Sequence, residues 1–332
     1  MVKSLNTLNT THNYENKINV KKRKSNRRKS NKNQSNQNQS NKNNIKKENK
    51  LKKTPFINNI YKTNGRVVVI GDLHGDWDAT VETLKNAGVL RENKYGNYVW
   101  IGGNTFVIQV GDQVDRKSRD IYDNTDEASE LKIIKLLDYL HNLAKKKGGA
   151  VLSLLGNHEL MNVEGNFNYA SDMGIRFFGG PDGRYNAFKP GGWLAKYLAE
   201  NRSSFFIVNN WLFVHGGITK EFVDNYSLNE LNYYVREYLL GNINYNSDQK
   251  LDYFLHHPNS VFWARNLGND SVNCEEVDYI CKKLKIKGIV VGHTVQEKIN
   301  CVCNGKVWRI DVGLSKSFGN RGFNQFKEFK KL

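Results

Sequence analysis

Five short polar motifs, each behind a run of apolar and β-prone residues, constrain this chain more than any other feature of its sequence. The apolar runs cover residues 67–70, 106–110, 151–155, 211–214 and 289–291. The motifs that follow are Gly71-Asp72-Leu73-His74-Gly75, Gly111-Asp112-Gln113-Val114-Asp115-Arg116, Gly156-Asn157-His158-Glu159, Val214-His215-Gly216-Gly217 and Gly292-His293-Thr294. Such runs are typical of buried strands, and open α/β sheets bind ligands beyond the carboxyl ends of their strands. Five motifs in the same setting therefore predict one shared active site.

The motifs contain a complete ligand set for two divalent metal ions. Carboxylate, amide oxygen and imidazole groups are the ligands that Mg²⁺, Mn²⁺, Fe and Zn²⁺ prefer. The ligands predicted for the first ion are Asp72, His74 and Asp112, and those for the second are Asp112, Asn157, His215 and His293. Two ions about 3.5–4 Å apart can activate hydroxide and hold both oxygens of an in-line phosphoryl displacement. The sequence thus favours phosphate-ester hydrolysis with a dinuclear centre, with Mn²⁺ expected and Fe, Zn²⁺ or Mg²⁺ as alternatives.

The same motifs supply candidates for proton transfer and phosphate binding. His158 lies next to a predicted ligand but is not needed as one, so we expect it to protonate the leaving group. Asp115 would orient His158 and favour its charged form, although a carboxylate there could also simply cap a loop. Arg116 suits bidentate phosphate binding. Arg265 is a second candidate for phosphate, with packing as its alternative role.

These motifs resemble those of the calcineurin-like metallophosphoesterases, and within them the phosphoprotein-phosphatase branch. The continuations Gly75-Asp76 and Glu159-Leu160-Met161-Asn162 are similar to the Shewanella-like protein phosphatases in particular. The resemblance covers roughly residues 65–316. It implies a four-layer α/β/β/α sandwich with the dinuclear site at the sheet edges, and the same roles for the ligands, the acid and Arg116. One departure is Lys117, which stands where the family motif has glycine.

The N-terminal residues 1–55 differ in composition from the rest of the chain. Residues 1–53 contain 16 Lys and Arg against two Glu, which is most of the net charge of +17. With almost no apolar side chains, this segment cannot offset the entropy cost of ordering, and we expect a disordered tail. Its basic residues (17–53) suggest nuclear import or non-specific contact with nucleic acid, and the alternative is a solvated tail without a partner. The catalytic domain is then expected at residues 56–332.

Within that domain the spacing of apolar residues predicts several helices. One is expected near residues 76–90 and a longer one over 126–147, with acidic residues in its first turn. Residues 165–205 are rich in glycine and aromatic residues and predict loops around a short helix at about 193–200. Ser227 and Glu230 form a capping-box pattern. Residues 220–260 are therefore expected to be a helical insertion between the fourth and fifth motif strands.

The cysteines and the overall hydropathy bear on the compartment. Cys274, Cys281, Cys301 and Cys303 lack the spacing of paired zinc knuckles, and we expect reduced thiols rather than a disulfide or a zinc site. No apolar run is long enough to span a membrane, and the N-terminus has no apolar signal segment. The expectation is an intracellular protein, cytoplasmic or nuclear, without membrane contact and not secreted.

The most consistent interpretation is a metal-dependent phosphomonoesterase that acts on phosphoprotein. A dinucleoside polyphosphate or small phosphate-ester hydrolase is an alternative, because the same two-metal centre serves those reactions. A binding protein tethered to nucleic acid through its basic tail is an alternative of another class. The sequence leaves open the choice between phosphotyrosine and phosphoserine or phosphothreonine, and it is silent on oligomeric state.

Overall fold

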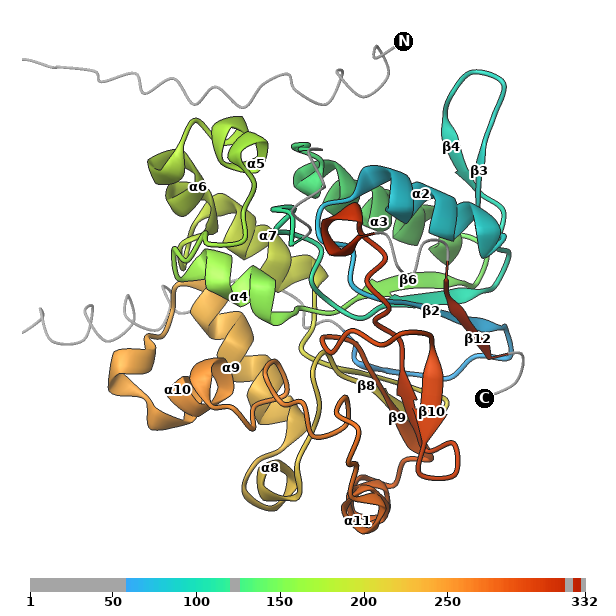
Figure 1. Cartoon of the computed structure of the whole chain (residues 1–332), viewed down its shortest axis with the longest axis vertical. Helices are drawn as coiled ribbons and strands as arrows, with labels where there is room; N and C mark the ends of the chain where they lie inside the picture. The colour runs from blue at the N-terminus through green and yellow to red at the C-terminus, as the bar shows by residue number, and fades with distance from the viewer. Residues whose placement is uncertain (1–57, 120–125, 320–324, 330–332) are drawn as a thin grey trace, which may run out of the picture. The chain divides into compact units, whose positions relative to one another are not determined.

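The computed structural model describes residues 58–119, 126–319 and 325–329. All of them belong to one compact unit, Phe56–Leu332. Two larger β-sheets and a two-stranded hairpin lie within this unit, with helices beside the sheets (Figure 1). The expected disordered tail, and with it the proposed nucleic-acid contact, falls outside the described residues.

The first sheet has four strands in the order β12-β2-β5-β6. Their bounds are β2 (Val67–Ile70), β5 (Phe106–Gln109), β6 (Ala150–Ser153) and β12 (Lys327–Phe329). Strands β2, β5 and β6 are parallel neighbours, whereas β12 is antiparallel to β2. The three strands ahead of the first three motifs therefore lie side by side and end at one edge of the sheet.

The second sheet has the order β1-β7-β8-β9-β11-β10. Its strands are β1 (Ile60–Tyr61), β7 (Phe206–Val208), β8 (Trp211–Phe213), β9 (Gly288–Val291), β10 (Asn300–Val302) and β11 (Val307–Arg309). Strands β8 and β9, which precede the last two motifs, are parallel and adjacent. A separate hairpin consists of β3 (Leu90–Glu92) and β4 (Tyr98–Trp100).

The alternation of side chains along β2 shows how the layers pack. Val67 and Val69 belong to a core cluster that also contains Phe213 of the second sheet, so this cluster lies between the two sheets. Val68 and Ile70 point the other way, into a cluster shared with α2 (Trp77–Asn86) and α3 (Glu130–Lys145). Successive residues of a strand face opposite sides, so an all-apolar strand must be covered on both faces.

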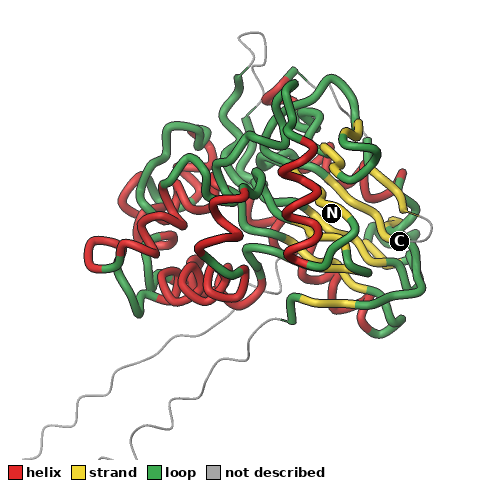
Figure 2. Tube along the Cα trace, turned by 90° about the horizontal axis from the view of Figure 1, so that it is seen from below, coloured by secondary structure: helices red, strands yellow, loops and turns green. Residues whose placement is uncertain are grey.

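Further helices cover the outer face of the second sheet, where Ile289 joins a core cluster with helical residues such as Leu231 and Ile280. Figure 2 shows a group of helices beside the strands. The remaining helices are α4 (Asn157–Val163), α5 (Asp172–Phe177), α6 (Pro181–Phe188), α7 (Trp193–Asn201), α8 (Lys220–Asn225), α9 (Leu228–Leu240), α10 (Gln249–His256) and α11 (Cys274–Leu284), with 3₁₀ turns η2 (Tyr245–Ser247) and η3 (Lys316–Phe318). Helix, sheet, sheet and helix follow one another, which confirms the four-layer α/β/β/α sandwich. Within the part of the chain that the structure describes, no helix is both long and apolar enough to cross a lipid bilayer.

Two helix predictions need correction. Helix α3 begins at Glu130 rather than Asp126, because the acidic residues before it bind elsewhere: Asp126 accepts a hydrogen bond from the backbone N–H of Met173, and Glu127 accepts one from Trp77. Residues 165–205 contain three helices (α5, α6 and α7) instead of one. Gly179 and Gly180, with φ of 86° and 102°, separate α5 from α6, and their presence made this region look like a loop.

The helical segment between β8 and β9 includes α8, α9 and α10. The capping box is confirmed at the start of α9, where the Ser227 hydroxyl accepts from the Glu230 backbone and the Glu230 carboxylate accepts from the Ser227 backbone. Gly241, with φ of 80°, ends that helix in the left-handed conformation that glycine adopts at low cost. Local capping therefore sets both ends of α9.

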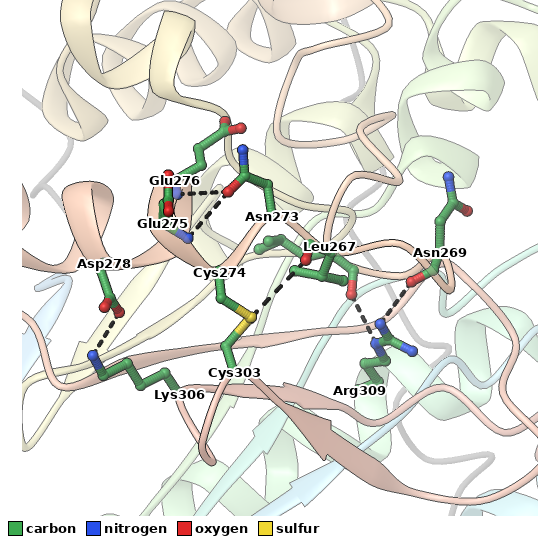
Figure 3. Close-up of a disulfide and its surroundings, with 11 residues drawn as sticks. Leu267, Asn269, Asn273, Cys274, Glu275, Glu276, Asp278, Cys303, Lys306 and Arg309 are labelled. Atoms are coloured by element: carbon green, nitrogen blue, oxygen red, sulfur yellow. Dashed lines mark hydrogen bonds and ion pairs between the residues drawn. A yellow bond between two sulfur atoms is a disulfide. The ribbon is translucent and has the colours of Figure 1, made fainter.

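A disulfide bond joins Cys274 and Cys303, which contradicts the expectation of reduced thiols. Figure 3 shows the bond between the start of α11 and the turn that follows β10, next to the Asp278–Lys306 ion pair. The fold brings the two residues together. Strand β9 follows α11 in the chain, and β11 pairs with β9, so the turn between β10 and β11 that contains Cys303 lies near α11. Disulfides persist in oxidising environments, so the intracellular expectation loses the support it drew from reduced thiols.

Replacement of Cys274 by Ser is expected to lower the free energy of unfolding by about 3 kcal/mol, because the bond closes a loop between residues 29 positions apart. Chemical denaturation under oxidising conditions measures this loss. The matched control is Cys301→Ser, since Cys301 is exposed and unbonded. Equal stability of the Cys274→Ser variant and the native chain would contradict a structural role for the bond.

Candidate active site

The five motifs meet where the two sheets lie against each other. Backbone N–H groups of Leu73 and His74 donate to the carbonyl oxygen of Asp112 (both 2.9 Å), which joins the ends of β2 and β5. The backbone N–H of His293 donates to Asp72 Oδ2 (3.0 Å), which joins the second sheet to the first. The Nδ1 atom of His215 lies 2.8 Å from the carbonyl oxygen of Val110. The strand ends thus form one connected site, as the motif pattern predicts.

Several of these residues have a backbone conformation that is rare for residues other than glycine. The φ angles are 41° at His74, 54° at Asp112, 72° at Asp115 and 65° at His293. Non-glycine residues in this region cost free energy and cluster at functional sites. The surrounding hydrogen bonds hold these turns in place, so the side chains are directed into the site before any ligand binds.

Two groups of potential ligands share Asp112. The first consists of His74, Asp112 and His158, and the second of Asp112, His215 and His293; the ligand atoms of each group lie within 4.8 Å of one another. In the second group, His215 Nε2 is 3.3 Å from Asp112 Oδ2 and 2.9 Å from Asn157 Oδ1. A carboxylate common to two such groups can bridge two ions.

Unsatisfied polar atoms indicate that this arrangement is suited to divalent cations. Asp72 Oδ1 and His293 Nε2 are buried and have no hydrogen-bond partner among the described residues. Burial and the carboxylates of Asp311 and Asp112 raise the pKa of Asp72 well above its usual value. Burial and the neighbouring His215 and Arg265 lower the pKa of His293 to about 2, which leaves a neutral imidazole with a lone pair. Bound cations would offset the cost of burying a charged Asp72 carboxylate, and they would accept the lone pair of the neutral His293 imidazole.

Glycine at two motif positions makes room for the carboxylates. A Cβ atom at Gly292 would lie 2.5 Å from Asp72 Oδ1, and one at Gly156 would overlap Asp112 Oδ1. Both contacts are far shorter than the usual separation of non-bonded atoms. The close approach of the Asp72 and Asp112 carboxylates therefore requires glycine at these two positions.

His158 and Asp115 form a hydrogen-bonded pair beside the ligands. His158 Nδ1 lies 2.6 Å from Asp115 Oδ2, and His158 Nε2 lies 3.9 Å from Asp112 Oδ2, so Nε2 faces the site. Burial disfavours the charged imidazolium, but Asp112 and Asp115 outweigh it and raise the pKa of His158. The geometry thus suits donation of a proton from Nε2.

Asp115 is itself held by residues whose roles were not expected from the sequence. Asn162 Nδ2 donates to its Oδ1 (2.8 Å), and Arg184 Nη2 lies 3.4 Å from the same atom. The Glu130 carboxylate accepts the backbone N–H of Asp115 (2.8 Å) and pairs with Arg184 (2.7 Å). Asn162 belongs to the quoted continuation of the third motif, whereas Arg184 had no sequence signal. The carboxylate of Asp115 is therefore held by side chains from other segments and contacts His158, which a carboxylate that only capped its own loop would not do.

Glu159, the last residue of the third motif, joins two motif loops. Its buried carboxylate accepts backbone N–H groups of Gly156 (2.7 Å), Asp112 (3.0 Å) and Gln113 (2.7 Å). The motif contains Glu159, but its role depends on two chain segments meeting, which local sequence does not show. This carboxylate positions Asp112 relative to Asn157 without entering either ligand group.

Replacement of Glu159 by Gln is expected to reduce metal affinity about 10- to 100-fold, as for other residues that orient metal ligands. The amide cannot accept all three N–H groups, so the Asp112 turn loses its position. Metal titration of the purified variant measures this change, with Glu164→Gln on the exterior of the same region as the matched control. Wild-type affinity in Glu159→Gln would contradict the positioning role.

The two predicted phosphate-binding arginines differ in their surroundings. Arg116 is completely buried, and its guanidinium lies near the carboxylates of Asp76 (4.0 Å) and Glu127 (3.6 Å). Phosphate binding by Arg116 stays a prediction. Arg265 is exposed and donates to the carbonyl oxygen of His293 and to Thr294 Oγ1 (both 3.1 Å). Arg265 therefore lies directly beside the fifth motif.

Lys117 causes no strain in the second motif. Its backbone does not adopt the positive φ that favours glycine, and its backbone N–H donates to the carbonyl oxygen of Tyr169 (3.0 Å). Its side chain is exposed. The local turn therefore does not need the glycine that the family pattern has at this position.

Comparison with known proteins identifies the family. The family model for calcineurin-like phosphoesterases matches residues 65–297. The chain belongs to this family. Calcineurin-like phosphoesterases are hydrolases that act on phosphate esters with a dinuclear divalent metal centre, and the two ligand groups around Asp112 are compatible with such a centre.

Relatives of this phosphoesterase include two named phosphatases. Shewanella-like protein phosphatase 2 of Arabidopsis thaliana is 30% identical over 298 residues, which cover 76% of this chain and 72% of the relative. Shewanella-like protein phosphatase 1 of Plasmodium berghei is 32% identical over 267 residues, which cover 76% and 68%. An uncharacterised protein of Acanthamoeba polyphaga mimivirus is 34% identical over 220 residues, 54% of this chain and 87% of the relative. The resemblance seen in the motifs is confirmed.

Among solved structures, the fold is similar to that of the cold-active protein-tyrosine phosphatase of a psychrophilic Shewanella species. The TM-score is 0.65 at 24% identity, and the match covers 80% of this phosphoesterase and 76% of that chain. At this level of identity the likeness concerns the fold. It agrees with the layer order derived from the core clusters.

Proposed function

We propose that this phosphoesterase is a protein phosphatase that hydrolyses phosphomonoesters at the site built from the five motifs. The observation that carries the proposal is the His158–Asp115 pair, held beside two ligand groups that share Asp112. Its relatives in Arabidopsis and Plasmodium are named as protein phosphatases, which supports phosphoprotein as the substrate class.

The proposed metal ligands are the six residues predicted from the motifs: Asp72, His74, Asp112, Asn157, His215 and His293. When bound, two divalent ions supply a nucleophilic hydroxide and stabilise charge on the phosphoryl group. Mn²⁺ is our expected metal, because the set mixes carboxylate, amide and imidazole ligands. Arg265, exposed beside His293, can bind an oxygen of the phosphate or of the substrate around it.

The chain then supplies proton transfer and orientation. Asp115 accepts a hydrogen bond from His158 Nδ1–H, which leaves Nε2–H directed toward the site. That proton passes to the leaving oxygen as the ester bond breaks, so the alcohol leaves uncharged. The buried setting of both residues keeps the imidazole in one orientation while the reaction proceeds.

Turnover by purified, metal-analysed protein tests the proposal. We expect Mn²⁺-dependent hydrolysis of an aryl phosphate and of phosphopeptides, with rates that exceed those on diadenosine polyphosphates. A panel of phosphotyrosine, phosphoserine and phosphothreonine peptides then defines the preferred substrate. Protein that binds metal yet hydrolyses none of these compounds would refute the proposal, and faster hydrolysis of the dinucleotides would favour the alternative enzyme.

The basic tail is a separate proposal, because residues 1–55 lie outside the described part of the chain. Its charge favours non-specific contact with nucleic acid. Salt-dependent binding to nucleic acid that is lost when residues 1–55 are deleted would support this contact, and unchanged binding would exclude it. Catalysis and such binding can coexist in one chain.

A further inference from the structure

Arg119 lies just after the second motif, and half of its guanidinium is bound to the motif itself. Its Nη1 donates to the carbonyl oxygens of Asp115 (2.8 Å) and Lys117 (2.6 Å). Its backbone N–H donates to the carbonyl oxygen of Ser317 (2.7 Å), which fixes the chain at this position. These bonds determine where the rest of the guanidinium can point.

Two aromatic rings hold the guanidinium next to the active site. The Cζ atom of Arg119 lies 4.9 Å from the ring centres of both Tyr169 and Phe318. The Tyr169 ring in turn lies 5.1 Å from that of His158, and the Phe318 ring lies 4.9 Å from that of His74. The two histidine rings are 4.8 Å apart. The five side chains therefore form a closed ring of contacts, which includes the proposed acid His158 and the proposed metal ligand His74.

The other half of the Arg119 guanidinium lacks a partner. Its Nη2 is buried and makes no hydrogen bond to any described residue. An unbonded buried donor costs free energy, more so in a charged group. Burial lowers the pKa of Arg119, and the carboxylates of Asp115 and Asp112 oppose this shift. Arginine nevertheless keeps its charge, so the position favours an anion.

Arg116 contrasts with this arrangement. It lies fully buried between the carboxylates of Asp76 and Glu127, which already balance its charge. Arg119 packs on Tyr169 and Phe318, and these rings contact His158 and His74. Arg119 therefore places a positive charge beside the two histidines.

We propose that Arg119 binds the phosphoryl group of the substrate through its free Nη2. This inference rests on the proposed phosphatase function. The carbonyl oxygens that hold Nη1 and the two aromatic rings keep the guanidinium in position before substrate arrives. Binding of the phosphoryl oxygens then supplies the acceptor that Nη2 lacks.

The test is the affinity of the full-length, metal-loaded enzyme for inorganic phosphate, measured as an inhibition constant and directly by calorimetry. Arg119→Gln is expected to weaken phosphate binding about 10- to 100-fold and to reduce kcat/KM for an aryl phosphate by a similar factor. Arg119→Lys should lie between, because lysine keeps the charge but not the second arm. Arg91→Gln, at an exposed position of strand β3, is the matched control.

Metal content and thermal stability separate a binding role from a structural one. Arg119→Gln with normal metal content, normal stability and weakened phosphate binding supports the proposal, whereas wild-type phosphate affinity in this variant overturns it. If the variants do not fold, modification of the native enzyme by phenylglyoxal decides: phosphate should protect Arg119 but not Arg91, and equal modification of Arg119 with and without phosphate overturns the proposal. Native enzyme without turnover would refute the phosphatase function, while the calorimetric comparison would still test Arg119.

Discussion

Asp112→Asn is expected to lower kcat about a thousandfold, which corresponds to roughly 4 kcal/mol of transition-state stabilisation. Asp112 belongs to both ligand groups, and its Oδ2 lies 3.3 Å from His215 Nε2 and 3.9 Å from His74 Nε2. Burial alone would raise the pKa of Asp112, but His215 and His158 hold it well below its usual value. The carboxylate is therefore charged, and asparagine removes that charge with little change of shape.

The metal content of Asp112→Asn reveals the cause of the lost activity. We expect fewer than two ions per chain in elemental analysis, because a neutral amide cannot bridge two cations as a carboxylate does. Asp278→Asn is the matched control, since Asp278 is exposed and pairs only with Lys306 among the contacts described. Two tightly bound ions and native turnover in Asp112→Asn would show that the two ligand groups do not share this residue.

The arrangement of the site follows from sequence where it depends on strand ends. Apolar runs predict β2, β5, β6, β8 and β9, and glycine-flanked motifs predict the turns that follow them. Parallel neighbours bring these turns together, as the hydrogen bond from His293 to Asp72 shows. The strands and the turns after them are each encoded in a short segment of the chain, so a pattern in the sequence can reveal them.

Features that depend on distant segments could not be predicted in the same way. Arg116 lies beside the carboxylates of Asp76 and Glu127, and the disulfide depends on the pairing of β11 with β9. Glu159 has its role only because the backbone N–H groups of two motif loops converge on it. Charge pairing and chain crossing are properties of the folded chain, and no local periodicity reports them.

His158→Asn is expected to reduce kcat by about 10²- to 10⁴-fold, the usual contribution of a positioned acid, while metal content stays at the native level. The reason is the orientation of the ring: Nδ1 is bound to Asp115, and Nε2 faces Asp112. His158 nevertheless falls within one of the two ligand groups, so metal analysis is the decisive control. A variant that lost its metal would refute the assignment as an acid.

The leaving group provides a second and independent test of the same role. Nitrophenolate departs without a proton, whereas the alkoxide of a serine side chain needs one. His158→Asn should therefore slow hydrolysis of a phosphoserine peptide far more than that of p-nitrophenyl phosphate. His257→Asn, where the ring stacks on Tyr253 in a different part of the fold, should leave both rates unchanged. Equal slowing of the two substrates by His158→Asn would mean that the residue positions the phosphate or a metal ion instead of donating the proton.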